Sequence, residues 1–224
     1  MQSFQPACIL FDLDGTLIDT APDLLACLNL ALEQHRAVSI DTDSLRPYIS
    51  YGALAMIERA QPDCDDSRKQ EILQTMLDLY QHNIAVHSRY FEGMAEVLDG
   101  LDSRGIKWGI VTNKRERFTL PLLSAFSLDQ RAACMISGDT TAHSKPHPEP
   151  MLKACADAQV SPEACIYIGD AQHDIEAGKN SGMQTMAALY GYLKPDDKPE
   201  HWGADFLIES PRHLSDWMQT HLCN

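Results

Sequence analysis

Several features are scarce or absent in this sequence, and each absence narrows what the protein can be. No apolar run approaches the roughly 20 residues of a membrane-spanning helix, so we expect no membrane partner. The first Lys or Arg is Arg36, so the charged start of a signal peptide is missing and we expect a cytoplasmic protein. Only 18 Lys and Arg stand against 32 Asp and Glu, a formal net charge of −14. Such a surface repels phosphate backbones, so we expect no nucleic-acid partner either.

Cysteine chemistry is also limited. The seven cysteines are odd in number and form no CxxC pair, which argues against a disulfide framework and a zinc site. We therefore expect reduced, mostly buried thiols. The sequence is 44% hydrophobic over 224 residues, which is enough for a real core and excludes disordered and fibrous proteins. That length suits one domain, or a core domain that carries a smaller one.

Short apolar runs alternate with helical patterns along most of the chain. The runs predict strands at 7–13, 108–112, 133–137, 165–169, 185–189 and 205–208. The helical patterns lie at 91–104, 117–126, 148–158, 174–181 and 211–221. This alternation predicts an α/β fold with a Rossmann-like parallel sheet and helices on both faces.

Residues 20–87 interrupt that alternation. They contain helical patterns at 21–35, 45–60 and 67–86 and no convincing strand. We interpret this block as an inserted helical-bundle cap. The predicted division is a core of residues 1–18 and 88–224 and a cap of residues 19–87, with hinges near 18–23 and 87–93.

The most informative residues follow the first predicted strand. Asp12 and Asp14 are two positions apart, so they begin on one side of the strand, at the end where open α/β sheets bind ligands. Two adjacent carboxylates repel each other, and a divalent cation offsets that repulsion. Gly15 permits a tight turn that other residues resist. Alone, this pattern also fits an acidic turn that caps a helix.

The run FDLDGTLIDT at 11–20 resembles the first motif of the haloacid dehalogenase superfamily. Three later motifs of that superfamily have counterparts, each expected near the end of its own strand. They are Thr112 in VTN, Lys145 in SKPHP, and Asp170 with Asp174 in GDAQHD. All four motifs occur in order over nearly the whole chain. The resemblance implies the superfamily's fold and a phosphoryl-transfer activity.

The resemblance also implies a role for each matched residue. Asp12 corresponds to the nucleophile that forms an aspartyl-phosphate, and Asp14 to the general acid and base. Thr112 and Lys145 would bind the phosphoryl group, with the Asn113 backbone as a further donor. Mg²⁺ would be held by Asp12, Asp170 and the Asp14 main-chain carbonyl. Asp174 would support this set from a second layer.

The helical block resembles the superfamily's four-helix cap, which closes over the site and contacts substrate. Its expected substrate loop is 49–53, where we single out Tyr51 and Gly52, although a plain turn between helices is equally compatible. Near the second motif, Lys114 or Arg115 is expected at the rim of the pocket.

Within the superfamily, the sequence is most similar to bacterial phosphoglycolate phosphatases. The stretches AVHSRYFEGM, YGYLKPDD and HWGAD resemble a branch that hydrolyses N-acetylmuramic acid 6-phosphate during peptidoglycan recycling. The expected substrate is therefore a small phosphate ester, either N-acetylmuramic acid 6-phosphate or 2-phosphoglycolate. A sugar phosphomutase of the same superfamily is an alternative, and a phospho-Asp signalling module is a weaker one. We expect a monomer or a homodimer.

Overall fold

A parallel sheet forms the centre of the protein, as the computed structural model of residues 5–38 and 40–222 shows; Cys223 lies outside these residues. The six strands are ordered β5-β4-β1-β6-β7-β8, and every neighbouring pair is parallel. They are β1 (Cys8–Phe11), β4 (Lys107–Val111), β5 (Met135–Ile136), β6 (Cys165–Gly169), β7 (Gln184–Ala188) and β8 (Phe206–Ile208). The predicted α/β fold class is confirmed.

Helices cover both faces of this sheet. They are α4 (Met94–Ser103), α5 (Glu116–Ala125), α6 (Glu149–Ala158), α7 (Gln172–Asn180) and α8 (Pro211–His221), with short 3-10 helices η2 (Pro162–Ala164) and η3 (Pro199–His201). Side chains alternate along β1: Ile9 and Phe11 pack with α4 and α8, whereas Cys8 and Leu10 pack with α6 and α7. This alternation follows from the two-residue period of a strand, and it explains why the predicted strands are apolar throughout.

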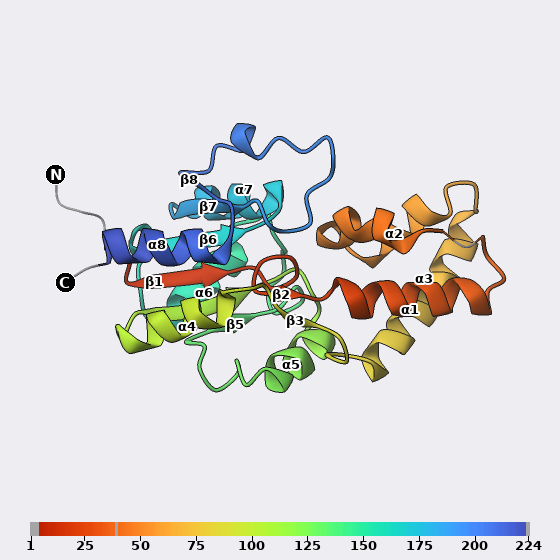
Figure 1. Ribbon diagram of the computed structural model, residues 1–224, viewed down its shortest axis with the longest axis horizontal. Helices are drawn as coiled ribbons and strands as arrows, with labels where there is room; N and C mark the ends of the chain where they lie inside the picture. The colour runs from red at the N-terminus through yellow and green to blue at the C-terminus, as the bar shows by residue number, and fades with distance from the viewer. Residues whose placement is uncertain (1–4, 39, 223–224) are drawn as a thin grey trace.

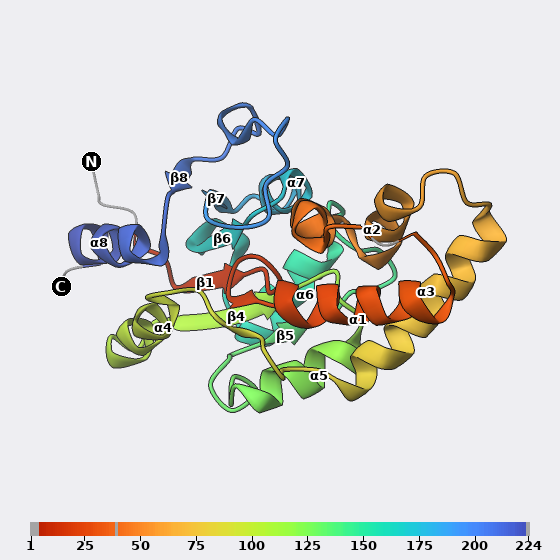
Figure 2. The same ribbon diagram turned by 45° about the vertical axis from the view of Figure 1, so that its right-hand side comes forward.

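The predicted helical block lies beyond one end of the sheet, at the right of Figures 1 and 2. It contains α1 (Ala21–Gln34), the 3-10 helix η1 (Thr42–Tyr51), α2 (Ala53–Ala60) and α3 (Asp66–His82). These elements supply most of a second hydrophobic cluster, which includes Leu28, Ile57 and Met76 together with Phe118 and Tyr192 from outside the block. The boundaries of 19–87 as a separate cap domain stay a prediction.

The chain enters and leaves the helical block through two adjacent segments. Strand β2 (Ile18–Asp19) pairs antiparallel with β3 (Arg89–Tyr90). One turn further on, the Asp23 carboxylate accepts hydrogen bonds from the backbone N–H groups of His87 and Ser88, at 2.8 and 2.9 Å. The predicted hinge segments are therefore tied together where they meet.

The helical pattern predicted at 45–60 forms two elements. Within the expected loop at 49–53, η1 ends at Tyr51 and α2 begins at Ala53. Gly52 separates them with φ 94° and ψ 166°, a conformation that is almost restricted to glycine. Pro47 lies inside η1 and has no N–H to donate to a regular helix. The third predicted helix also ends earlier, at His82 instead of residue 86.

The cysteines agree with the sequence-based expectation. The six cysteines of the described residues are all free, and only Cys64 among them is not fully buried. Within residues 5–38 and 40–222, no helix combines the length and the apolar character needed to cross a membrane.

Candidate active site

The three central strands end at the residues that the motifs single out. Asp12 directly follows β1, Thr112 follows β4, and Asp170 follows β6. Because β4, β1 and β6 are parallel neighbours, their carboxyl ends meet at one edge of the sheet. This edge faces the helical block (Figures 1 and 2). Residues far apart in the sequence therefore converge where the two parts of the protein meet.

Lys145 lies at the centre of this edge and is 4% exposed. Its Nζ is 2.7 Å from Asp12 Oδ1 and 2.7 Å from Asp174 Oδ1. It also lies 2.8 Å from the Tyr167 hydroxyl and 3.0 Å from the Val111 carbonyl oxygen. Burial opposes its charge, but the two carboxylates raise the pKa of Lys145 above its usual value, so it is a fixed cation.

Asp14 has a different cation as its partner. The Lys114 ammonium donates to both Asp14 oxygens, at 2.9 and 3.2 Å. The Thr20 hydroxyl donates to Asp14 Oδ1 at 2.5 Å. Burial opposes the charge of Lys114, but Asp14 raises the pKa of that ammonium. Each of the two motif carboxylates thus has its own lysine, although the carboxylates are only two residues apart.

Within residues 5–38 and 40–222, the hydrogen-bond partners of Asp170 include no cation. It accepts hydrogen bonds from the Tyr192 backbone N–H at 2.7 Å, the Ser50 hydroxyl at 2.9 Å and the Thr16 hydroxyl at 3.3 Å. Burial, together with the nearby charges of Asp12 and Asp174, raises the pKa of Asp170 well above its usual value. Burial likewise raises the pKa of Asp12 to about 7, against the opposing effect of Lys145.

The donor set fits a divalent metal ion. Carboxylate oxygens of Asp12, Asp170 and Asp174 lie within 4.8 Å of one another, and Lys145 pairs with only two of the three. The Lys145 charge therefore offsets only part of the negative charge that the three carboxylates carry when all are ionised, and hard oxygen ligands of this kind suit Mg²⁺. Asp174 is the member that stays ionised most readily, because Lys145 and its hydrogen bonds lower its pKa despite burial.

A cavity of about 550 Å³ opens between this edge and the helical block. Asp12, Asp14, Thr112 and Lys145 line its inner end. The helical block contributes both polar and apolar side chains, among them Gln70, Gln74, Leu24, Leu73 and Leu77. Arg115 and Arg117 add positive charge to the wall. The cavity can therefore hold an anionic group at the carboxylates and a larger, partly apolar remainder against the helices.

The predicted contact residues differ in where their side chains point. Tyr51 and Gly52 line the cavity, as do Lys114 and Arg115. Asn113 also lines the cavity, and its side chain binds the Lys145 backbone: Oδ1 accepts from the Lys145 N–H at 3.0 Å, and Nδ2 donates to the Lys145 carbonyl at 3.1 Å. Asn113 therefore holds the segment that presents Lys145.

Sequence reasoning did not single out two tyrosines beside the site, and it included Ser50 only as part of the expected substrate loop 49–53. Tyr192 links the two parts of the protein, since its N–H binds Asp170 and its hydroxyl accepts from the Thr20 and Ala21 N–H groups at 2.8 and 3.0 Å. Ser50 reaches Asp170 from η1. Tyr80 of α3 lines the cavity. In the sequence, Tyr80 reads as part of an apolar helix face, and Tyr192 appears only within the stretch YGYLKPDD, which carries no chemical motif.

Comparison with known proteins agrees with this geometry. A family model described as "Haloacid dehalogenase-like hydrolase" matches residues 9–188. The chain belongs to the haloacid dehalogenase-like hydrolase family. The resemblance found in the sequence is thereby confirmed.

Relatives within this family are named as phosphatases. The chain is 39% identical to an N-acetylmuramic acid 6-phosphate phosphatase of Pseudomonas aeruginosa, with 100% of both chains covered. It is 43% identical to a phosphoglycolate phosphatase of Xylella fastidiosa, over 94% of this chain and 92% of that one. A solved Haemophilus somnus structure, described as a predicted phosphoglycolate phosphatase, matches with a TM-score of 0.85 and 26% identity, covering 98% and 100% of the two chains. This haloacid dehalogenase-like hydrolase is an enzyme, a phosphatase.

Proposed function

We propose that this phosphatase is Mg²⁺-dependent and hydrolyses a small phosphate ester through an aspartyl-phosphate intermediate. The observation that carries the proposal is the pair of neighbouring carboxylates with separate partners. Asp12 contacts Lys145, and Asp14 contacts Lys114 and Thr20. Two carboxylates in different environments can perform different tasks in one reaction.

Asp12 is the proposed nucleophile. Its carboxylate oxygen attacks phosphorus, and the bond between phosphorus and the ester oxygen breaks. Lys145 supports this role, because its contact with Asp12 Oδ1 at 2.7 Å holds one oxygen in place. The Asp12 side chain lines the cavity, so the ester can approach it.

Asp14 is the proposed general acid and base. It protonates the leaving alkoxide as the ester bond breaks, and then takes a proton from the water that attacks the phosphorylated Asp12. That second attack breaks the aspartyl–phosphate bond, releases inorganic phosphate and restores both carboxyl groups. Lys114 and Thr20 hold the Asp14 carboxylate at the cavity during these steps.

Charge on the transferred phosphoryl group needs stabilisation from fixed donors. We assign this role to Thr112, the Asn113 backbone, Lys114 and Lys145. Mg²⁺, when bound by Asp12, Asp170 and the Asp14 main chain, supplies further charge compensation. Asp174 supports this set through Lys145, which it contacts at 2.7 Å.

We favour N-acetylmuramic acid 6-phosphate as the substrate. Support comes from the full-length relative of that name and from the cavity of about 550 Å³, a size typical of sites for drug-sized ligands. Its mixed lining suits an amino-sugar ring, which has polar edges and apolar faces, and its arginines suit the lactyl carboxylate. The two-carbon acid 2-phosphoglycolate would occupy only part of this space, but the Xylella relative's name makes it the second candidate.

We also propose a cytoplasmic location, which the free thiols support.

The test of substrate is a comparison of kcat/KM by phosphate release. The purified chain with Mg²⁺ is assayed on N-acetylmuramic acid 6-phosphate, 2-phosphoglycolate and glucose 6-phosphate. We expect the first to be preferred by about tenfold or more. A preference for 2-phosphoglycolate would reverse the substrate assignment, and no release from any ester would overturn the proposed function.

The nucleophile is tested separately by the Asp12→Asn variant. Its rate of phosphate release should fall by roughly 10⁴-fold or more, while its circular dichroism spectrum stays that of the wild type. The exposed Asp139→Asn variant is the matched control and should keep full activity. Turnover of Asp12→Asn near that of the wild type would refute the aspartyl-phosphate route.

A further inference from the structure

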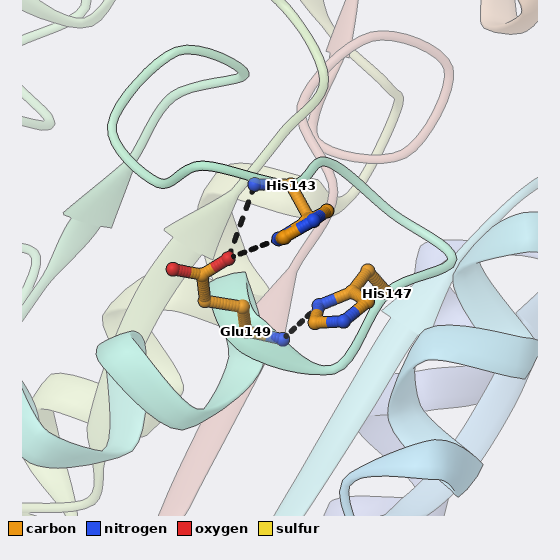
Figure 3. Close-up of side chains that lie close together, drawn as sticks. All are labelled: His143, His147 and Glu149. Carbon is orange, nitrogen blue, oxygen red and sulfur yellow. Dashed lines mark hydrogen bonds and ion pairs between the residues drawn. The ribbon is translucent and has the colours of Figure 1, made fainter.

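A second group of side chains that could hold a metal ion lies outside the cavity. His143, His147 and Glu149 come from the segment between β5 and the start of α6, and none of them lines the cavity. Each offers a ligand atom, and these atoms lie within 4.8 Å of one another. Figure 3 shows the two imidazole rings side by side, with the Glu149 carboxylate turned toward His143. The cluster is independent of the proposed phosphatase chemistry.

The three side chains already interact closely. Glu149 Oε2 lies 2.8 Å from His143 Nδ1 and accepts the His143 backbone N–H at 3.1 Å. The Glu149 backbone N–H donates to His147 Nδ1 at 3.2 Å. The two rings stack with centroids 4.3 Å apart and an interplanar angle of 25°. The His143 contacts lower the pKa of the Glu149 carboxyl, which is thus an anion at neutral pH.

Two imidazoles and one carboxylate form a different donor set from the oxygen-only cluster at the strand ends. Nitrogen ligands suit Zn²⁺ and other first-row transition ions, whereas Mg²⁺ prefers oxygen. Three protein ligands with water in the fourth position make a recognised zinc geometry. Both histidines are exposed, so their rings can turn toward a shared ion without disturbing the core.

We propose that His143, His147 and Glu149 bind one divalent transition-metal ion, such as Zn²⁺, with water completing the coordination. On binding, the two neutral rings each direct a nitrogen lone pair at the ion, and the carboxylate supplies one negative charge. The hydrogen bond that Glu149 Oε2 accepts from the His143 ring is then replaced by metal–ligand bonds.

An ion bound at this site would affect the segment that carries Lys145. His143 and His147 stand two residues before and two residues after Lys145, and Asn113 holds Lys145 by its backbone. An ion bound to both histidines joins the two sides of the segment that presents Lys145. Binding should therefore restrict that segment and raise the melting temperature of the protein, since the unfolded chain does not preform the site.

The test is a Zn²⁺ titration of the full chain without a histidine tag, in competition with a chromophoric chelator. Excess Mg²⁺ is added so that it fills the proposed metal site at the strand-end carboxylates and keeps Zn²⁺ from binding there. We expect one Zn²⁺ per chain, with affinity reduced about tenfold or more in His147→Ala and in Glu149→Gln. The exposed His201→Ala variant is the matched control and should bind as the wild type does.

Two results would overturn the proposal. One is no measurable Zn²⁺ binding by the wild type. The other is equal binding by the wild type and the His143→Ala/His147→Ala double variant, which would place the ion elsewhere in the protein. Melting temperatures with and without Zn²⁺ provide the second readout: the wild type and His201→Ala should gain stability, and the double variant should not.

Discussion

At the scale of single residues, Tyr80 has an unusual hydroxyl. It is one of two buried side-chain polar atoms without a hydrogen-bond partner in the described part of the chain; the other is Trp217 Nε1. Tyr80 is 1% exposed yet lines the cavity. Burial raises the pKa of Tyr80 to about 12, so the hydroxyl keeps its proton and can donate. A group that is costly to leave unpaired becomes useful when a ligand pairs with it.

The Tyr80→Phe variant tests this interpretation. Without substrate, we expect its free energy of unfolding to stay equal to that of the wild type or to rise by about 1 kcal/mol, because an unpaired buried hydroxyl is removed. With substrate, KM should rise several-fold. Tyr90→Phe is the control, since the Tyr90 hydroxyl is 3.3 Å from the Phe126 carbonyl and away from the cavity. An unchanged KM in Tyr80→Phe would mean that the hydroxyl does not contact substrate.

Residues such as Tyr80 mark the limit of sequence reasoning about this site. Asp12, Thr112 and Lys145 were predicted because each stands at a fixed offset from a recognisable strand end or motif. Tyr80 and Tyr192 carry no such signal: their roles depend on the packing of the helical block against the sheet. The contact between the Asn113 side chain and Lys145 was not predicted for the same reason, because the two residues are distant in sequence.

At the scale of elements, the junction between η1 and α2 positions side chains across the cavity. Ser50 reaches Asp170, and the Tyr51 ring lies 4.0 Å from Lys194 Nζ. Gly52, with φ 94°, sets the direction in which α2 leaves η1. A Cβ at this position would meet no atom within 4 Å, so the backbone conformation alone requires glycine here.

We expect Gly52→Ala to lower the free energy of unfolding by about 1–3 kcal/mol, the cost of forcing alanine into this conformation. KM should also rise, because relaxation of the junction displaces Ser50 and Tyr51. Gly105→Ala is the matched control: it has φ 66°, open space around its Cβ and a position away from the cavity. Denaturant unfolding and steady-state kinetics measure both effects. Equal behaviour of the two variants would show that the junction does not control substrate binding.

The elements themselves were predicted to different degrees. The strand Cys165–Gly169 and the helix Pro211–His221 have the expected bounds, since a continuous apolar run or a regular amphipathic pattern determines each. The expected loop at 49–53 contains the break at Gly52, but the two-residue pair of β2 and β3 was not predicted. Two residues are too few for a periodic pattern, and their pairing joins segments about 70 positions apart in sequence.

At the scale of the whole molecule, the net charge of −14 has two physically different parts. Most acidic residues lie at the surface and affect solubility and the choice of partner. Asp12, Asp170 and Asp174 are buried together, and Lys145 offsets only part of their charge. Burying these three carboxylates together therefore lowers the free energy of unfolding until a cation binds them. Activity and stability should both depend on the metal through the same three side chains.

We expect the effect of Asp170→Asn on the free energy of unfolding to depend on the metal: the variant should be more stable than the wild type without metal and should lose this advantage when Mg²⁺ is present. With EDTA, we expect its free energy of unfolding to exceed that of the wild type by at least about 1 kcal/mol, because the buried Asp170 must either keep its charge or take up a proton at neutral pH, whereas asparagine does neither. The asparagine oxygen can accept from Tyr192 and Ser50, and its amide can donate to the Thr16 hydroxyl. With Mg²⁺, the wild type should gain stability and the variant should not, and phosphatase activity should be lost. Thermal unfolding with Mg²⁺ and with EDTA measures both differences, with Asp139→Asn as a control that behaves as the wild type. If Mg²⁺ stabilised the wild type and Asp170→Asn equally, Asp170 would not be a ligand of the metal.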